Sequence, residues 1–143
     1  MIFPTMTGSN LSGKKFHVPH DLEGDYNIIN VAFDMYQQYS VDTWLPFLEK
    51  LPARYPNLRF YELPTVPQYG AFQRMLIDGW MRQGIPDPVV RARTITLYVN
   101  VSEFIEKLSL PGVSTIYTFL LDRDGKILSR IDGPFTDAMG KTL

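Results

Sequence analysis

Hydrophobic and polar residues alternate along the chain in blocks that predict strands and helices in turn. Asn27 to Phe33 is a nearly continuous apolar run rich in Ile and Val, which is typical of a strand covered on both faces. Leu58 to Leu63 alternates with period two, and Thr94 to Val99 is rich in β-branched residues, so both predict strands. Lys15 to Val18 predicts a shorter strand. Residues 1–14 have the Pro, Gly, Ser and Asn content of a loop.

The segment after the first long strand predicts an amphipathic helix from Val41 to Leu51. Ser40 can cap this helix, and Asp42 favours its positive N-terminal end. Pro46 predicts a kink and Pro52 the end of the helix. One face of a 3.6-residue period holds Val41, Trp44, Leu45, Leu48 and Leu51.

A second helix is predicted to begin at Thr65 and Gln68, which have the spacing of a capping box. Gly84 predicts its C-terminal end, with Pro86 and Pro88 beyond. Its predicted apolar side consists of Phe72, Met75, Leu76 and Trp80.

The last third of the chain predicts a short helix and a hairpin. Asn100 and Glu103 can cap the helix, whose apolar face is Val101, Phe104, Ile105 and Leu108. A short connection containing Gly joins two strands, Thr115 to Leu121 and Ile127 to Ile131, which favours an antiparallel hairpin. Thr136 to Leu143 predicts a final short helix.

This order of elements predicts an α/β fold. Strands that alternate with helices give a parallel sheet, to which the hairpin adds an antiparallel edge, so we expect a central mixed sheet with helices on both faces. With no internal repeat and no long linker, residues 1–143 are expected to form a single domain.

Composition restricts the function classes. A hydrophobic share of 45% and a charged share of 20% are ordinary for a globular protein. The net charge of -1 argues against nucleic-acid or anionic-membrane partners. No apolar run approaches the roughly 18 residues of a membrane span. Without a secretion-signal pattern, the expected location is cytoplasmic; the alternative is an exported or organellar protein whose targeting segment is absent from this chain.

The chain contains no cysteine. Disulfides, thiolate nucleophiles and thiolate metal sites are therefore excluded. The compartment stays open, because a cysteine-free protein can exist in either redox environment.

Four stretches carry a family resemblance. Leu11 to Gly24 is similar to an opening "L-x-G-K…P-x-D-L-x-G", and Pro46 to Leu48 matches a helix motif "P-x-L". Thr118 to Ile127, with Gly133 after it, is similar to "T-x-F-L-I-D-x-D-G-K-I…G". Together with Asn30 to Phe33, which is similar to the strand before a redox loop, these stretches resemble the thioredoxin-like superfamily, especially its TlpA and peroxiredoxin branches.

That resemblance implies where a redox site would stand. Counting back from Pro46, the family's two cysteines would fall at Gln38 and Val41, and its cis-proline at Ile116. A cis bond before a residue other than proline costs about 3–4 kcal/mol, so we expect a trans bond before Ile116. Both parts of the redox site are replaced, which implies that thiol-redox activity is absent.

A second resemblance concerns a group without a working redox pair. Arg82 to Pro86 and Tyr117 to Asp122 resemble the mitochondrial ATP-synthase assembly-factor family. This resemblance implies an assembly or protein-binding role.

The turn in place of the redox loop is the first candidate site. Open α/β sheets bind ligands at the carboxyl ends of their strands, and N–H groups at a helix start can hold an anion or a carboxylate. The alternative is a capped turn with exposed polar residues. No residue there is a nucleophile with a base beside it. The predicted binding residues are Tyr36, Gln37, Gln38, Ser40, Val41, Ile116 and Tyr117.

Three further groups each have a functional and a structural interpretation. His17 and His20, with nearby acids, are either metal ligands or, as we favour, surface histidines. Trp80 and Tyr69 either line a partner-binding patch or belong to the core or its rim. A third group consists of Arg74, Arg82, Arg91 and Arg93. It either holds a phosphate or a carboxylate or, as we favour, forms a solvated face or surface ion pairs with Asp78 and Asp87.

Our functional hypothesis is a redox-inactive thioredoxin-like domain that binds a protein or peptide at the former active-site edge, as a binding or assembly module. We expect no catalytic residue, metal or cofactor. Two alternatives stay open. One is an oxidoreductase relative whose cysteines were lost or substituted. The other is a small-ligand binder.

Overall fold

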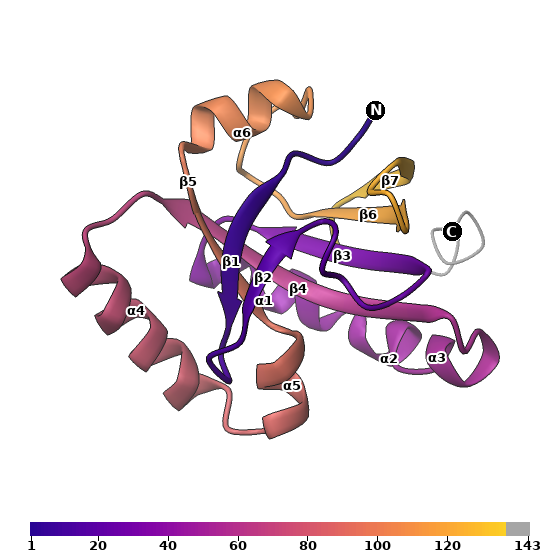
Figure 1. Cartoon of the computed structure of the whole chain (residues 1–143), viewed down its shortest axis with the longest axis horizontal. Helices are drawn as coiled ribbons and strands as arrows, with labels where there is room; N and C mark the ends of the chain where they lie inside the picture. Colours follow the sequence, from indigo (N-terminus) through magenta and orange to yellow (C-terminus); the bar gives the residue numbers. More distant parts are fainter. Residues whose placement is uncertain (137–143) are drawn as a thin grey trace.

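The structure is a computed structural model that describes residues 1–136 (Figure 1). The predicted last helix, Thr136 to Leu143, lies outside the described residues except for its first residue. Seven strands form one sheet in the order β2-β1-β5-β4-β3-β6-β7. Strands β3, β4 and β5 are parallel, and the remaining pairs are antiparallel. The strands are β1 (Met6–Asn10), β2 (Lys15–Val18), β3 (Tyr26–Ala32), β4 (Leu58–Pro67), β5 (Ile95–Val99), β6 (Tyr117–Asp122) and β7 (Ile127–Asp132).

Helices lie on both faces of this sheet, with α6 on one side and α1 to α3 on the other (Figure 1). The helical segments are η1 (Met35–Gln37), α1 (Gln38–Asp42), α2 (Leu45–Leu48), α3 (Leu51–Arg54), α4 (Ala71–Gly84), α5 (Pro88–Arg93) and α6 (Val101–Lys107). The predicted mixed α/β sheet with a C-terminal antiparallel hairpin is confirmed. So is the short helix after β5, where the Asn100 side chain accepts a hydrogen bond from the Glu103 N–H at 3.2 Å.

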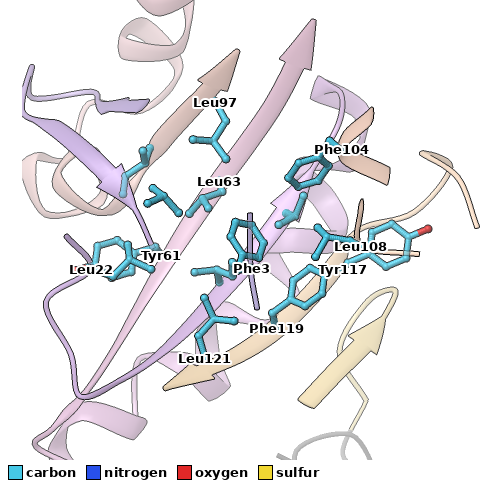
Figure 2. Close-up of a cluster of buried hydrophobic side chains, with 14 of the residues drawn as sticks. Phe3, Leu22, Tyr61, Leu63, Leu97, Phe104, Leu108, Tyr117, Phe119 and Leu121 are labelled. Carbon is cyan, nitrogen blue, oxygen red and sulfur yellow. The ribbon is translucent and has the colours of Figure 1, made fainter. Parts of the chain in front are cut away.

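Two buried clusters occupy the two faces because side chains of β3 alternate between them. Ile29 and Val31 join the larger cluster, in which Phe3 packs edge-on against the α6 residue Phe104, with ring centroids 6.0 Å apart (Figure 2). Ile28 joins the smaller cluster, which includes Trp44, Leu48 and Ile131 beneath α1 and α2. The continuous apolar run of this strand thus follows from burial on both faces.

The predicted helix Val41 to Leu51 is wrong as a single helix. Its place is taken by three short helices, α1, α2 and α3. Proline lacks an N–H and is tolerated in the first turn of a helix but not further along it. Pro46 accordingly lies in the first turn of α2 and Pro52 in the first turn of α3. Pro52 therefore lies near the start of a helix and does not end one.

The capping box at Thr65 and Gln68 is also wrong. Thr65 continues β4, pairs with Leu97 of β5, and donates its hydroxyl hydrogen to the Leu63 carbonyl at 3.0 Å. Pairing with a neighbouring strand outweighs the local helix pattern. Helix α4 begins only at Ala71, after Gly70.

Strand β1 lies in the stretch predicted to be a loop. It pairs with β2 on one side and with β5 on the other. Gly8 is needed there because a Cβ at that position would stand 2.7 Å from both Leu97 Cδ2 and the Thr96 carbonyl oxygen. The turn-like composition of residues 1–14 concealed a strand whose glycine serves close packing.

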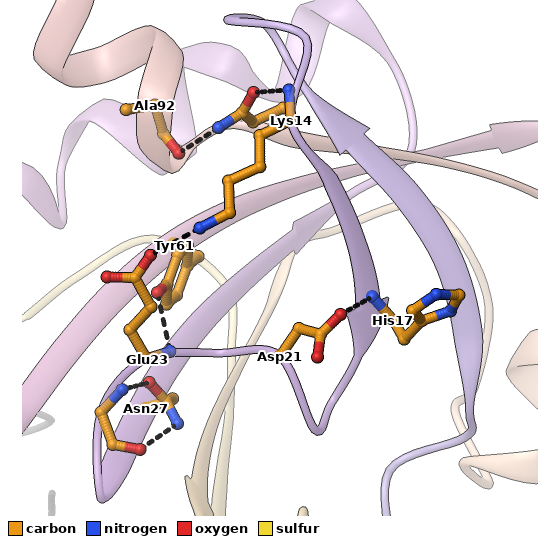
Figure 3. A network of polar contacts seen from close by, with 9 residues as sticks. Lys14, His17, Asp21, Glu23, Asn27, Tyr61 and Ala92 are labelled. Atoms are coloured by element: carbon orange, nitrogen blue, oxygen red, sulfur yellow. Dashed lines mark hydrogen bonds and ion pairs between the residues drawn. The ribbon is translucent and has the colours of Figure 1, made fainter.

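Polar contacts tie the N-terminal strands and the following loop to the sheet (Figure 3). Asn10 accepts a hydrogen bond from the Lys14 N–H at 2.8 Å and donates one to the Ala92 carbonyl at 3.0 Å. The Tyr61 hydroxyl accepts the Glu23 N–H at 3.0 Å, and burial raises the pKa of that tyrosine. These contacts hold the β1–β2 hairpin against α5 and hold the loop after β2 against β4.

Candidate functional site

The turn that replaces the redox loop is a capped structure held by one buried side chain. Asp34 caps η1 by accepting hydrogen bonds from the N–H groups of Tyr36 and Gln37. The Gln37 side chain accepts the Phe33 N–H at 2.6 Å and donates to the Val113 carbonyl at 2.7 Å. Gln37 therefore joins this turn to the segment that leads into β6.

The seven predicted binding residues separate into a buried and an accessible group. Ile116 is fully buried, and it shares a cluster with Val41. The peptide bond before Ile116 is trans, as predicted. Within residues 1–136, the cis peptide bond is the one between Val18 and Pro19. The buried group is Gln37, Val41, Ile116 and Tyr117; the accessible group is Tyr36, Gln38 and Ser40.

A groove of about 750 Å³ opens beside the turn, and of the seven predicted binding residues Gln38 and Val41 line it. Alternate side chains of β4 form its floor, since those of one face of a strand recur every second residue. Helix α1 forms one wall, and α4 with α5 forms the other. The lining includes Phe60, Glu62, Pro64 and Val66 from β4, Gln38 and Asp42 from α1, Ile77, Trp80 and Met81 from α4, and Val90 and Arg93 from α5.

Helix α4 buries none of its residues, although it is 14 residues long. The predicted apolar side of this helix is exposed, with 68% of Phe72, 61% of Met75 and 64% of Trp80 accessible. Soluble proteins rarely leave a contiguous apolar surface uncovered without a binding role. Trp80 and Tyr69 therefore do not belong to the core, and both line the groove.

Polar contacts, and not apolar packing, attach α4 to the sheet. The Tyr98 hydroxyl donates to Asp78 Oδ1 at 2.9 Å, and the Arg74 guanidinium lies 4.7 Å from the centre of the Tyr98 ring. Burial, followed by the Asp78 carboxylate, raises the pKa of Tyr98. Arg82 donates to the Leu11 carbonyl at 3.0 Å. Of the predicted apolar side of this helix, Trp80 lines the groove together with Ile77 and Met81, whereas Phe72, Met75 and Leu76 do not line it.

Among the described residues, the four arginines form no ion pair with Asp78 or Asp87, and their guanidinium groups contact separate partners. Arg91 donates to the carbonyls of Ile85 and Arg82, which links α5 to the end of α4. Within residues 1–136, Asp78 instead accepts the Tyr98 hydroxyl, and Asp87 caps α5 by accepting the Val89 N–H at 2.9 Å. The Arg91 guanidinium thus pairs carbonyls at the C-terminal end of α4, where a helix leaves its last carbonyls without intrahelical partners.

Glu62 is the charged residue on the floor of the groove. The pKa of its carboxyl is raised to about 7, chiefly by burial and then by the nearby Asp42 carboxylate, against the opposing effects of a Gln38 hydrogen bond and Arg93. Arg93 lies over the Phe60 ring at 4.5 Å and pairs with Glu49 at 3.5 Å. The groove therefore combines an apolar lining with a carboxyl group that changes protonation near neutral pH.

Both histidines are exposed, in agreement with the surface interpretation. The Asp21 carboxylate accepts the His17 backbone N–H at 2.7 Å, so it holds the loop (Figure 3). Glu23 pairs with Lys14 at 3.2 Å. Among the described residues, no three His, Asp or Glu side chains are arranged to hold a metal ion, and no helix is long and apolar enough to cross a membrane.

Comparison with known proteins identifies the fold. The chain matches no protein-family model and no curated protein sequence. Among solved structures, it is similar to the thioredoxin domain of a thiol-disulfide oxidoreductase from Bacteroides vulgatus, with a TM-score of 0.62, 19% identity, and coverage of 99% of this chain and 92% of that one.

Two other solved structures agree. An exposed lipoprotein thioredoxin from Streptococcus pneumoniae gives a TM-score of 0.60 at 15% identity, covering 97% of each chain. BsSco, a member of the Sco family of cytochrome c oxidase assembly proteins, gives 0.62 at 15% identity, covering 99% of this chain and 90% of that one. The chain thus has the thioredoxin-like fold found in thiol–disulfide oxidoreductases. Its own sequence contains no cysteine with which to perform their reaction.

Proposed function

We propose that this protein is a redox-inactive thioredoxin-like binding module whose groove takes an apolar peptide segment of a partner protein. The observation that carries the proposal is a groove of about 750 Å³ between β4 and a helix that buries none of its own residues. The absence of cysteine leaves shape and contact as the means by which this edge of the fold can act.

The lining supports an apolar occupant. Ile77, Trp80 and Met81 come from α4, and they face a floor that contains Phe60 and Val66. Covering such side chains contributes about 25 cal/mol per Å² of apolar surface removed from water. An apolar groove with a few convergent polar groups is the usual form of a binding site.

The same groove supports a second candidate function, the binding of a small apolar ligand. Its volume lies within the roughly 300–1,000 Å³ of small-molecule sites. The remaining alternative, a relative of thiol oxidoreductases with lost or substituted cysteines, is compatible with either binding role.

Selection from a random 12-residue peptide library tests the proposal. We would select on the wild type and measure the affinity of the enriched peptides for Ile77→Arg, which places a charge in the α4 wall of the groove. Gln73→Arg is the matched control, because Gln73 is exposed on the same helix and does not line the groove. We expect at least a tenfold loss of affinity for Ile77→Arg and little change for Gln73→Arg.

Tryptophan fluorescence gives an independent measure. Trp80 lines the groove and is exposed, whereas Trp44 is fully buried, so a peptide in the groove shifts the Trp80 emission to shorter wavelength. Equal affinity for both arginine variants, or no enriched peptide, would contradict peptide binding. A thermal shift produced by small apolar compounds and abolished in Ile77→Arg would favour the small-ligand alternative.

A further inference from the structure

We propose that the peptide segment taken by the groove carries a lysine or arginine whose cation lies against Glu62 and Asp42, flanked by apolar residues. This inference rests on the proposed function and specifies the chemistry of the partner. It follows from the positions of the charges inside an otherwise apolar groove.

The charges that line the groove are strongly unbalanced. Four carboxyl groups line it, on Asp34, Asp42, Glu62 and Asp87, against the single guanidinium of Arg93 among the described lining residues. An occupant with a negative charge would meet these carboxylates in a partly dehydrated space, where repulsion is stronger than in water. Charge complementarity therefore favours a cationic occupant.

The local contacts identify which carboxylates are available to a partner. Asp34 and Asp87 accept backbone N–H groups as helix caps. Arg93 is engaged by Glu49 and by the Phe60 ring. Because Asp34, Asp87 and Arg93 already have partners, a cation in the groove would lie against Glu62 on the floor and Asp42 on the α1 wall.

The side chain of Gln38 lies between the carboxyl groups of Glu62 and Asp42 and interacts with both. Gln38 Nε2 donates to Asp42 Oδ1 at 3.0 Å, and the Gln38 side chain also hydrogen-bonds Glu62. A buried charge is costly unless it is paired, and an incoming ammonium or guanidinium would pair Glu62 while its methylene chain lies along the apolar lining. Apolar residues on either side of that cation would contact Trp80 and Val66.

The protonation of Glu62 gives this contact a pH dependence. The groups facing Glu62 are Gln38 and Asp42 from α1 and Arg93 from α5. With the pKa of Glu62 at about 7, ionisation on raising the pH from 6 to 8 increases the fraction of binding-competent protein about tenfold. A peptide that requires the carboxylate gains affinity by that factor.

The experiment compares matched probes on matched variants. The probe is the tightest peptide from the library selection, together with a copy in which its basic residue is replaced by norleucine, which keeps the chain length without the charge. Both are titrated against the wild type, Glu62→Gln and Glu106→Gln; Glu106 is exposed on α6 and lies outside the groove. Thermal melting confirms that each variant is folded.

We expect the basic peptide to bind the wild type and Glu106→Gln at least tenfold more tightly than its norleucine copy at pH 8. In Glu62→Gln that preference should fall below about threefold, and the pH dependence between 6 and 8 should disappear. Enriched peptides that require the groove but show no preference for a basic residue would overturn this inference and leave the proposed function standing. Peptides that bind Ile77→Arg as well as the wild type would overturn both.

Discussion

Replacing Glu62 by Gln should make the protein more stable at high pH and leave its stability almost unchanged at low pH. Burial raises the pKa of the Glu62 carboxyl from its ordinary 4.5 to about 7 in the folded protein. The folded state therefore binds this proton more tightly than the unfolded chain does. The contribution to stability is full below pH 4.5 and is lost as the pH rises through about 7.

The size of this effect follows from the two pKa values. The difference between about 7 and 4.5, at about 1.4 kcal/mol for each unit, corresponds to about 3 kcal/mol. Relative to Glu62→Gln, which carries no titrating group there, the wild type should lose about 3 kcal/mol of unfolding free energy between pH 4 and pH 9.

Urea denaturation followed by tryptophan fluorescence at a series of pH values measures that difference directly, because the buried Trp44 reports on unfolding. Glu106→Gln, at an exposed position, is the control and should follow the wild type at every pH. If the difference between the wild type and Glu62→Gln stays constant within about 0.5 kcal/mol, or grows in favour of the wild type as the pH rises, the reasoning about the buried carboxyl is refuted.

Three further predictions concern the turn, strand β1 and helix α4. Gln37→Ala removes two hydrogen bonds of a buried side chain and should lower the unfolding free energy by about 2–4 kcal/mol. Tyr36→Ala, at 86% exposure, should change that free energy by less than about 0.5 kcal/mol. Equal effects of the two substitutions in urea denaturation would refute the bridging role of Gln37. Gly8→Ala forces a Cβ against β5 and should lower the unfolding free energy by about 1–3 kcal/mol. Gly79→Ala, which has open space around its Cβ in α4, should raise the unfolding free energy by about 0.5–1 kcal/mol. A loss of stability in Gly79→Ala would show that α4 is packed more closely than the structure has it. Tyr98→Phe removes the hydroxyl contact to α4 and should speed amide hydrogen exchange in that helix and not in α6; unchanged exchange would mean that other contacts hold it.

Hydrophobic periodicity was sufficient to predict a strand where burial on both faces of the sheet leaves a strong pattern in the sequence. The run Asn27 to Phe33 and the hairpin of β6 and β7 were predicted because their side chains alternate between two buried clusters or end at a Gly-containing turn. The cap at Asn100 was found for a similar reason, since its side-chain contact is local in sequence.

Long-range contacts decided the elements that were predicted wrongly. Thr65 has the sequence of a helix cap, yet pairing with Leu97, 32 positions further along the chain, keeps it in β4. Gly8 resembles a turn residue until β5 lies against it. Neither partner can be identified from local composition.

The groove illustrates the same limit for the site. The apolar pattern of α4 was detected, but pattern alone cannot show that this side is exposed, or that Ile77 and Met81 line an open groove beside Trp80. The one local signal for the groove is the carboxylate of Glu62, which stands between the apolar residues Phe60 and Pro64 on the same face of β4.

The most direct test of the binding function is a chemical-shift map of the ¹⁵N-labelled protein titrated with the tightest peptide from the library selection. If the groove binds the peptide, the largest amide shifts should fall on α4, on the second half of β4 and on the turn from Met35 to Asp42, which surround the groove. Shifts concentrated on β6 and β7, with α4 unchanged, would contradict binding in the groove.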